Sequence, residues 1–171
     1  MKTRNISLTP DQVSLWNKLK DSSNSDPIIY YRNDRATGDT FVGIAAILER
    51  CVNSSHQIAC IASKKIYSLR FILLPMLLEM ITNYYGGDIT FNVNKKNIEV
   101  LFSNGSQIHF VDLDDRPSDT SFSRLWSRSY HIGLIDDSSN ISDLAIRSLS
   151  SRIRENRDEY SWENKLLVNL S

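Results

Sequence analysis

The first helix is indicated by its start signals and by the spacing of its apolar residues. Thr9 and Gln12 stand three positions apart, as in a capping box, and Pro10 takes the first helical position. A helix that begins here places its apolar side chains on one face. The residues that predict this buried stripe are Val13, Leu15, Trp16 and Leu19.

After a polar loop, the pattern changes to a strand, a polar turn, a helix and a second strand. Residues 28 to 31 are apolar and β-prone, which is typical of a buried parallel strand. Residues 32 to 40 are polar, residues 41 to 51 have a helical pattern, and residues 57 to 62 form the next apolar run. This succession predicts a βαβ unit whose two strands are parallel.

The second half of the chain predicts a helix, a hairpin and another strand–helix–strand succession. Residues 67 to 84 have a helical pattern that should bend near Pro75. Two alternating runs then flank Asn104-Gly105, and this dipeptide between such runs is the strongest short-range signal for a β-hairpin. The remaining predicted elements are strands at 98 to 102, 107 to 111, 131 to 135 and 166 to 170, and a helix at 141 to 156.

Together these elements predict an α/β fold. We expect a mainly parallel sheet that is flanked by helices and has an antiparallel hairpin inserted before the acidic strand that ends at Asp136. With 171 residues and no visible repeat or linker, residues 1 to 171 should form a single domain. The composition, 41% apolar and 23% charged, is that of a globular protein.

Charge and cysteine content narrow the function only slightly. Lys plus Arg equals Asp plus Glu, 20 against 20, so net charge indicates no nucleic-acid partner, although a basic face is compatible with it. The two cysteines, Cys51 and Cys60, lack zinc-site spacing and predict reduced structural thiols. The longest apolar run, residues 71 to 81, is interrupted by Pro75 and Glu79 and is too short to span a bilayer. We therefore expect a soluble, cytoplasmic protein without a membrane partner.

Gly38-Asp39-Thr40 joins a predicted strand to a predicted helix, at the place where a phosphate-binding loop has Gly-Lys-Thr. In such loops, backbone N–H groups bind phosphate, glycine permits close approach and the hydroxyl reaches magnesium. Asp39 replaces the lysine, and its carboxylate would repel a triphosphate, so Arg32 or Arg35 would have to supply positive charge. The alternative is an ordinary structural turn, in which Asp39 stabilises the helix dipole.

The acidic strand end Asp136-Asp137 is the second candidate site. An apolar strand that ends in two acids has the form of a Walker B motif, whose first carboxylate holds magnesium and whose second polarises the attacking water. Asp137 is one methylene shorter than the usual glutamate. Two acids after a strand are equally ordinary helix-capping residues, so the pair alone leaves both interpretations open.

The order of these motifs resembles the N-terminal ATPase domain of the large terminase subunit, the P-loop DNA-packaging motor of tailed phages. The resemblance covers about residues 8 to 151. It rests on Arg35 three positions before Gly38, on the hairpin turn Asn104-Gly105-Ser106 and on the acidic strand end. It implies a P-loop NTPase-like fold with degenerate Walker A and Walker B motifs. In the family a nuclease domain follows, and we expect none in this sequence.

The resemblance also implies a role for each matching residue. Asp137 and Arg35 would be catalytic, and Thr40 and Asp136 would bind the metal. The nucleotide-binding positions would be Gln12 toward the adenine, then Arg35, Thr37, Gly38, Asp39 and Thr40 along the phosphates. The implied cofactors are ATP and Mg²⁺. The implied partners are double-stranded DNA, packaging-motor or capsid subunits, and further copies of the chain.

Two functions of different classes stay open. The first is a terminase-like ATPase domain of viral DNA packaging, with hydrolysis weakened or lost because Asp39 replaces the lysine. The second is a non-catalytic interaction protein that keeps the P-loop fold and docks onto a packaging motor, a capsid or a related subunit. Basic clusters fit a solvated surface better than a DNA contact. They are Lys64-Lys65, Lys95-Lys96 and the group Arg147, Arg152, Arg154 and Arg157.

Overall fold

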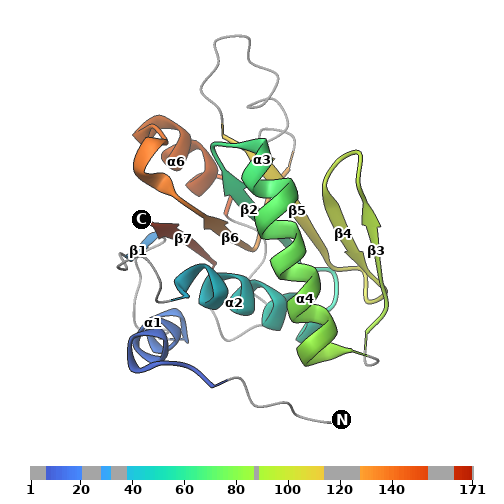
Figure 1. The fold of residues 1–171 in the computed structure, drawn as a ribbon. Coiled ribbons are helices and arrows are strands. Elements are labelled where there is room, and N and C mark those ends of the chain that lie inside the picture. The colour runs from blue at the N-terminus through green and yellow to red at the C-terminus, as the bar shows by residue number, and fades with distance from the viewer. Residues whose placement is uncertain are drawn as a thin grey trace.

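The chain is built around one mixed sheet. The computed structural model describes residues 7–20, 28–31, 38–86, 89–113, 128–153 and 164–170 of the chain. The strand order of the sheet is β1-β7-β6-β2-β5-β4-β3. The first five of these strands run parallel, and β4 and β3 continue the sheet in antiparallel fashion (Figure 1). The strands are β1 (Ile28–Tyr31), β2 (Ile58–Ser63), β3 (Phe91–Asn94), β4 (Glu99–Phe102), β5 (Gln107–Asp112), β6 (Ile132–Ile135) and β7 (Lys165–Asn169). The predicted α/β sheet with an inserted hairpin is confirmed.

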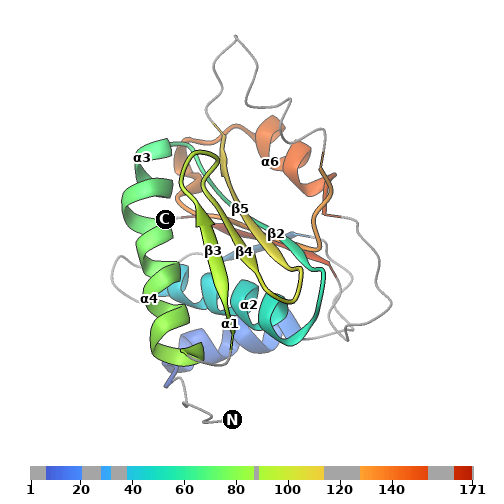
Figure 2. The same cartoon turned by 90° about the vertical axis from the view of Figure 1, so that its right-hand side faces the viewer.

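Helices cover both faces of this sheet (Figures 1 and 2). On one face lie α1 (Pro10–Lys20), α2 (Asp39–Asn53) and a helical stretch made of α3 (Ile66–Ser68), the π-helical turn η1 (Leu69–Leu73) and α4 (Leu74–Tyr85). The other face carries α6 (Asp143–Ser150), which follows a 3₁₀ turn, η2 (Ser138–Asn140). Successive residues of β2 alternate between the two cores: Ala59 and Ile61 pack in the first, Cys60 and Ala62 in the second.

The start of α1 has the predicted capping box. The backbone N–H of Thr9 donates to Gln12 Oε1 at 2.9 Å, and the N–H of Gln12 lies 3.4 Å from Thr9 Oγ1. One position of the predicted buried stripe is wrong, because Val13 is exposed. Gln12 is buried instead, since its amide also bonds to the chain ahead of α2.

The helical stretch after β2 is irregular at the place where a bend was predicted. The π-helical turn η1 directly precedes α4, whose first turn contains Pro75. Proline has no N–H to donate, so the regular ladder cannot continue unchanged at this point. The whole stretch, Ile66–Tyr85, is long and apolar enough to cross a membrane by length and composition alone. Its inner side chains, including Leu69, Leu73 and Leu77, pack in the first core.

The hairpin formed by β4 and β5 is tied to the end of α2. Asn104 Nδ2 donates to the backbone oxygens of Cys51 at 2.8 Å and Ser54 at 3.2 Å. Ser106 Oγ donates to Ser54 O at 2.9 Å and accepts from the N–H of Gln57 at 3.1 Å. The Asn-Gly-Ser turn therefore satisfies carbonyl groups that the helix end leaves without intrahelical partners.

Two further predictions need adjustment. β3 was not predicted, because its alternation of Phe91 and Val93 with asparagines is too polar and too short to indicate a strand. Helix α6 ends at Ser150, short of the predicted residue 156, and residues 154–160 lie outside the described part.

Cys51 and Cys60 are buried free thiols, as predicted, and burial raises the pKa of the Cys51 thiol to about 12.

Candidate functional site

The candidate site lies at the carboxyl ends of the parallel strands β1, β7 and β6. Tyr31 pairs with Asn169, and Ile135 pairs with Val168, so the three strands end at one edge of the sheet. Parallel sheets place functional side chains at this edge, in the loops that follow the strands. Here β7 separates β1 from β6, and it brings a residue from the end of the chain into the site.

The central contact joins the two candidate motifs. Thr40 stands in the first turn of α2, and its Oγ1 donates to Asp136 Oδ1 at 2.7 Å. Asp136 directly follows β6, and its backbone N–H bonds to Ala62 O, which extends the pairing with β2. Both side chains are partly exposed. The sheet therefore brings together the two residues to which the sequence analysis assigned magnesium.

Gly38 has a backbone that other residues adopt with difficulty. Its φ is +74°, in the left-handed region. A Cβ at this position would lie 2.8 Å from Gln12 Nε2, and that same nitrogen donates to Gly38 O at 3.2 Å. The left-handed backbone favours glycine here, and a Cβ would in addition displace the end of the Gln12 side chain. Gln12 consequently connects the first turn of α1 to the chain ahead of α2.

Helix α2 packs closely against the strands that lead into the site. A Cβ on Gly43 would lie 2.8 Å from Leu134 Cδ1 in β6 and 3.3 Å from the Tyr31 hydroxyl in β1. Absence of a side chain at Gly43 lets the axis of α2 approach the sheet. The apolar residues around it, from Val42 to Leu48, are fully or almost fully buried. This packing fixes the start of α2, and with it Thr40, relative to Asp136.

Asn169 is a site residue that sequence reasoning did not select. It is the last residue of β7, and its Nδ2 lies 3.4 Å from Asp136 Oδ1. Its Oδ1 is buried and has no hydrogen-bond partner within the described part of the chain. The only sequence signal was a polar residue at the end of an apolar run. That signal does not say that β7 lies beside the strand ending in Asp136.

The two adjacent carboxylates differ in their surroundings. Asp137 is exposed, has a left-handed backbone with φ 53°, and accepts a hydrogen bond from Ser139 Oγ at 2.7 Å. The left-handed turn directs the chain into η2, whose Ser138 hydroxyl is buried without a hydrogen-bond partner in the described part. Asp136 bonds to Thr40, whereas Asp137 bonds to its own turn.

The donor set suits a hard cation. Among the described residues, no group of three His, Cys, Asp or Glu side chains is placed to hold a metal. The oxygens that meet at this edge are the Thr40 hydroxyl, the Asp136 carboxylate and the unbonded Asn169 Oδ1. Mg²⁺ takes oxygen ligands and usually keeps several waters and substrate phosphates beside one or two carboxylates. One carboxylate and a hydroxyl therefore fit Mg²⁺ with a nucleotide, and they do not fit an all-protein metal cage.

Comparison of the sequence with protein-family models gives no match, and comparison with curated proteins gives none either. Solved structures do match. The large terminase of a thermophilic bacteriophage superimposes with a TM-score of 0.73, at 17% identity over 96% of this chain. The HK97 bacteriophage large terminase gives 0.71, at 11% identity over 97% of the chain. The Thermus phage P74-26 large terminase ATPase domain gives 0.59, at 10% identity over 96%.

The fold is that of a phage large terminase ATPase domain. The chain spans 39% of the first of these terminase chains and 33% of the HK97 chain, but 70% of the P74-26 ATPase domain. Two further structures of the first terminase, in complex with ADP and with ATP-gamma-S, each match this chain with a TM-score of 0.68. The resemblance in motif order is thus accompanied by the same terminase fold.

Several predicted site residues lie outside the part of the chain that the structure describes, or are described only in part. Arg35 and Thr37, and the substitute cation Arg32, lie outside the described residues. Asp39 is described only as the first backbone position of α2. Gln12 is buried, and both ends of its amide bond to the chain, to Thr9 N and to Gly38 O. The structure brings Gln12, Gly38, Thr40 and Asp136 together, with Asn169 in addition.

Proposed function

We propose that this chain is a terminase-like P-loop ATPase domain of viral DNA packaging, which binds ATP weakly and hydrolyses it slowly or not at all. The observation that supports this most is the 2.7 Å hydrogen bond from Thr40 to Asp136. It couples the first turn of the helix after β1 to the acid after β6, in a fold shared with terminase ATPase domains. A structural turn and a helix cap, taken separately, would not require this contact.

Mg²⁺ bound with ATP would neutralise charge on the phosphates. Thr40 and Asp136 would hold the cation, and Asn169 would orient the Asp136 carboxylate through its Nδ2. The backbone N–H groups at the start of α2 face the same edge and would bind phosphate oxygens. Asp137, exposed beside them, would take the position of the water-polarising acid. The thermophilic bacteriophage terminase, which shares this fold, has been solved in complex with ADP and with ATP-gamma-S, and this supports nucleotide binding as the function.

Asp39 is the reason for proposing weak binding. At an effective dielectric typical of a protein surface, two unit charges about 4 Å apart interact by roughly 4 kcal/mol. An aspartate in place of lysine changes such an attraction into a repulsion, unless Arg32 or Arg35 supplies a compensating charge.

We place the protein in the host cytoplasm as a single domain, with double-stranded DNA, motor or capsid subunits and further copies of the chain as partners.

Calorimetric titration with adenylyl imidodiphosphate and Mg²⁺ tests the proposal. The unaltered chain is compared with Asp39→Lys and with Asp143→Lys. Asp143 is the matched control, because it is an exposed aspartate at the first position of α6 and is not one of the candidate site residues. We expect Asp39→Lys to bind at least about tenfold more tightly than the other two proteins, a gain of about 1.4 kcal/mol or more.

The outcomes separate the two candidate functions. Micromolar binding by the unaltered chain would indicate a working site with a substitute cation, and ATP hydrolysis in the presence of DNA would be measured next. Binding by Asp39→Lys alone would favour the second candidate, a non-catalytic interaction protein, because Asp39 would then prevent nucleotide binding by the unaltered chain. If no protein binds nucleotide, the ATPase proposal is wrong for this chain.

A further inference from the structure

An apolar ridge lies exposed at the start of the helical stretch after β2. It consists of Ile66, Tyr67, Phe71 and Ile72, which are 47%, 63%, 64% and 48% exposed. The rings of Tyr67 and Phe71 pack against each other with centroids 4.9 Å apart. Part of the ridge belongs to the π-helical turn η1, and such turns often occur at functional sites. Clustered exposed apolar side chains of this kind mark interaction surfaces.

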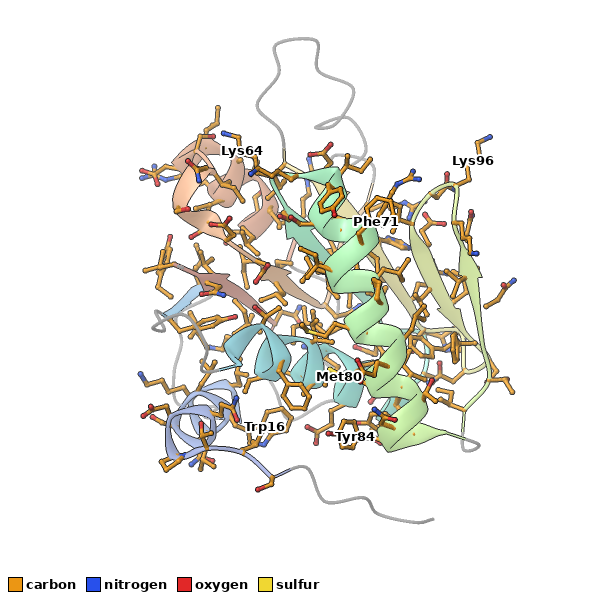
Figure 3. All side chains as sticks on the ribbon, viewed as in Figure 1. Trp16, Lys64, Phe71, Met80, Tyr84 and Lys96 are labelled. Carbon is orange, nitrogen blue, oxygen red and sulfur yellow. The ribbon has the colours of Figure 1, made fainter. Side chains whose placement is uncertain are left out.

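The charged side chains that border this ridge on the helical stretch are basic. Lys65 directly precedes it and Arg70 lies within it, whereas the Lys64 ammonium donates to Asn140 O at 2.7 Å. Arg70 and Lys65 are exposed. In the view of Figure 3, Phe71 lies between Lys64 and Lys96. Glu79 is exposed on the same stretch, two turns further along and beyond the ridge. Complementary charge sets the specificity of an interface, so the border favours an acidic partner.

A cavity of about 390 Å³ opens beside the ridge. Ile66, Leu69 and Arg70 line it from the helical side, and Ile98 and Phe110 line it from the sheet. Two acids, Glu99 and Asp112, also line the cavity. Arg128 lies 3.0 Å from Glu99 Oε1 and 2.8 Å from His109 Nδ1. Arg70 and Lys96 line the same cavity, and neither side chain bonds to another described residue. The lining thus joins apolar side chains from the helix and the sheet to three cations and two acids, so positive charge is in excess.

We infer that the ridge and this cavity dock a short acidic and apolar segment of a partner protein. One apolar side chain of that segment enters the cavity, and its carboxylates face Arg70 and Lys96. A cavity beside an exposed aromatic pair is the arrangement that anchors an inserted side chain. A lipid bilayer would use the ridge and the basic border but not the cavity, and this favours a protein segment. The inference does not depend on nucleotide binding.

Fluorescence anisotropy with labelled decapeptides tests this surface. The probe alternates aspartate or glutamate with leucine or phenylalanine, and the control peptide has lysine in place of every acid. Arg70→Glu and Phe71→Ser alter the surface. Arg147→Glu and Leu144→Ser are matched controls, since both residues are exposed on α6, on the other face of the sheet. Vesicles of phosphatidylserine and phosphatidylcholine, and ultracentrifugation of the protein alone, complete the experiment.

We expect the acidic peptide to bind saturably and the lysine peptide not to bind. Arg70→Glu and Phe71→Ser should each raise Kd by roughly tenfold or more, as loss of an interface anchor does, while the α6 variants leave Kd unchanged. Equal binding by all variants would overturn the inference. So would vesicle binding that requires Phe71 without peptide binding, or self-association that Phe71→Ser abolishes. Thr40→Ala should leave peptide binding intact, which separates this surface from the nucleotide site.

Discussion

Thr40 and Asp136 are 96 residues apart in sequence and share a 2.7 Å hydrogen bond across the carboxyl edge of the sheet. A hydrogen bond to a charged acceptor is stronger than a neutral one and holds the carboxylate in one orientation. The same two oxygens are those that would share a magnesium ion with a nucleotide. Under the proposed function this contact would hold the carboxylate in place for the cation, and the hydroxyl can be tested separately from the carboxylate.

Replacing Thr40 by alanine should weaken magnesium-dependent nucleotide binding by roughly tenfold, or about 1.4 kcal/mol, because one oxygen ligand is lost. The measurement is a titration with and without Mg²⁺ in the Asp39→Lys background, where the loop carries a cation. Thr40→Ser keeps the hydroxyl and should bind as the background does. Thr82→Ala removes an exposed threonine from α4 and serves as the control. Equal magnesium dependence in Thr40→Ala would contradict the proposed role.

The fold could be predicted from sequence where local signals and topology agree. The capping box of Thr9 and Gln12 and the Asn104-Gly105 hairpin each have short-range chemistry that specifies one geometry. β3 lacked such a signal, because a four-residue polar strand at a sheet edge gains its stability from pairing with β4. Val13 was wrongly predicted to be buried, because the orientation of α1 also depends on a tertiary contact. Spacing alone does not show that Gln12 is the side chain turned toward α2.

The candidate site was predictable only in part. Thr40 and Asp136 belong to motifs with a strand–helix context that the sequence itself displays. Asn169 became visible only through the strand order, since β7 lies between β1 and β6 although it is the last strand in sequence. Long-range strand order depends on which buried strands pair, and several orders are compatible with the same apolar pattern.

Asn104→Ala should lower the free energy of unfolding by about 2 kcal/mol, because carbonyl groups at the end of α2 lose their donor. Urea denaturation followed by circular dichroism measures this. Asn92→Ala is the matched control: Asn92 is exposed in the neighbouring strand β3, and its replacement should change stability by less than about 0.5 kcal/mol. Equal effects of the two substitutions would mean that the turn does not hold the helix end.

Gly38→Ala should destabilise the fold through two separable causes. The left-handed backbone costs a residue with a Cβ about 1 kcal/mol, and that Cβ also meets Gln12 Nε2. A double-mutant cycle with Gln12→Ala isolates the second cause, because the double variant keeps the backbone cost but has no clash. We expect the double variant to be more stable than the sum of the single effects. Simple additivity would show that a Cβ at position 38 does not clash with the Gln12 side chain.

The stability of the protein should fall in mild acid because of His109. Burial and the neighbouring Arg128 lower the pKa of this imidazole from 6.5 to about 4, while Glu99 acts in the opposite direction. Tyr130 packs edge-on against the ring. Between these two pH values the unfolded chain binds a proton that the folded protein does not bind. The free energy of unfolding should therefore fall as pH decreases from about 6.5 toward 4, by roughly 3 kcal/mol at most.

Urea unfolding at successive pH values, compared between the unaltered protein and His109→Gln, measures this contribution. Glutamine has no proton to gain in this range, and its amide can still accept a hydrogen bond from Arg128. The variant should therefore lose the pH dependence between 6.5 and 4 that the imidazole supplies. Arg147→Gln, which removes an exposed arginine on α6, should keep the full dependence. If His109→Gln and the unaltered protein lose stability in parallel, other groups cause the acid sensitivity and the buried imidazole does not.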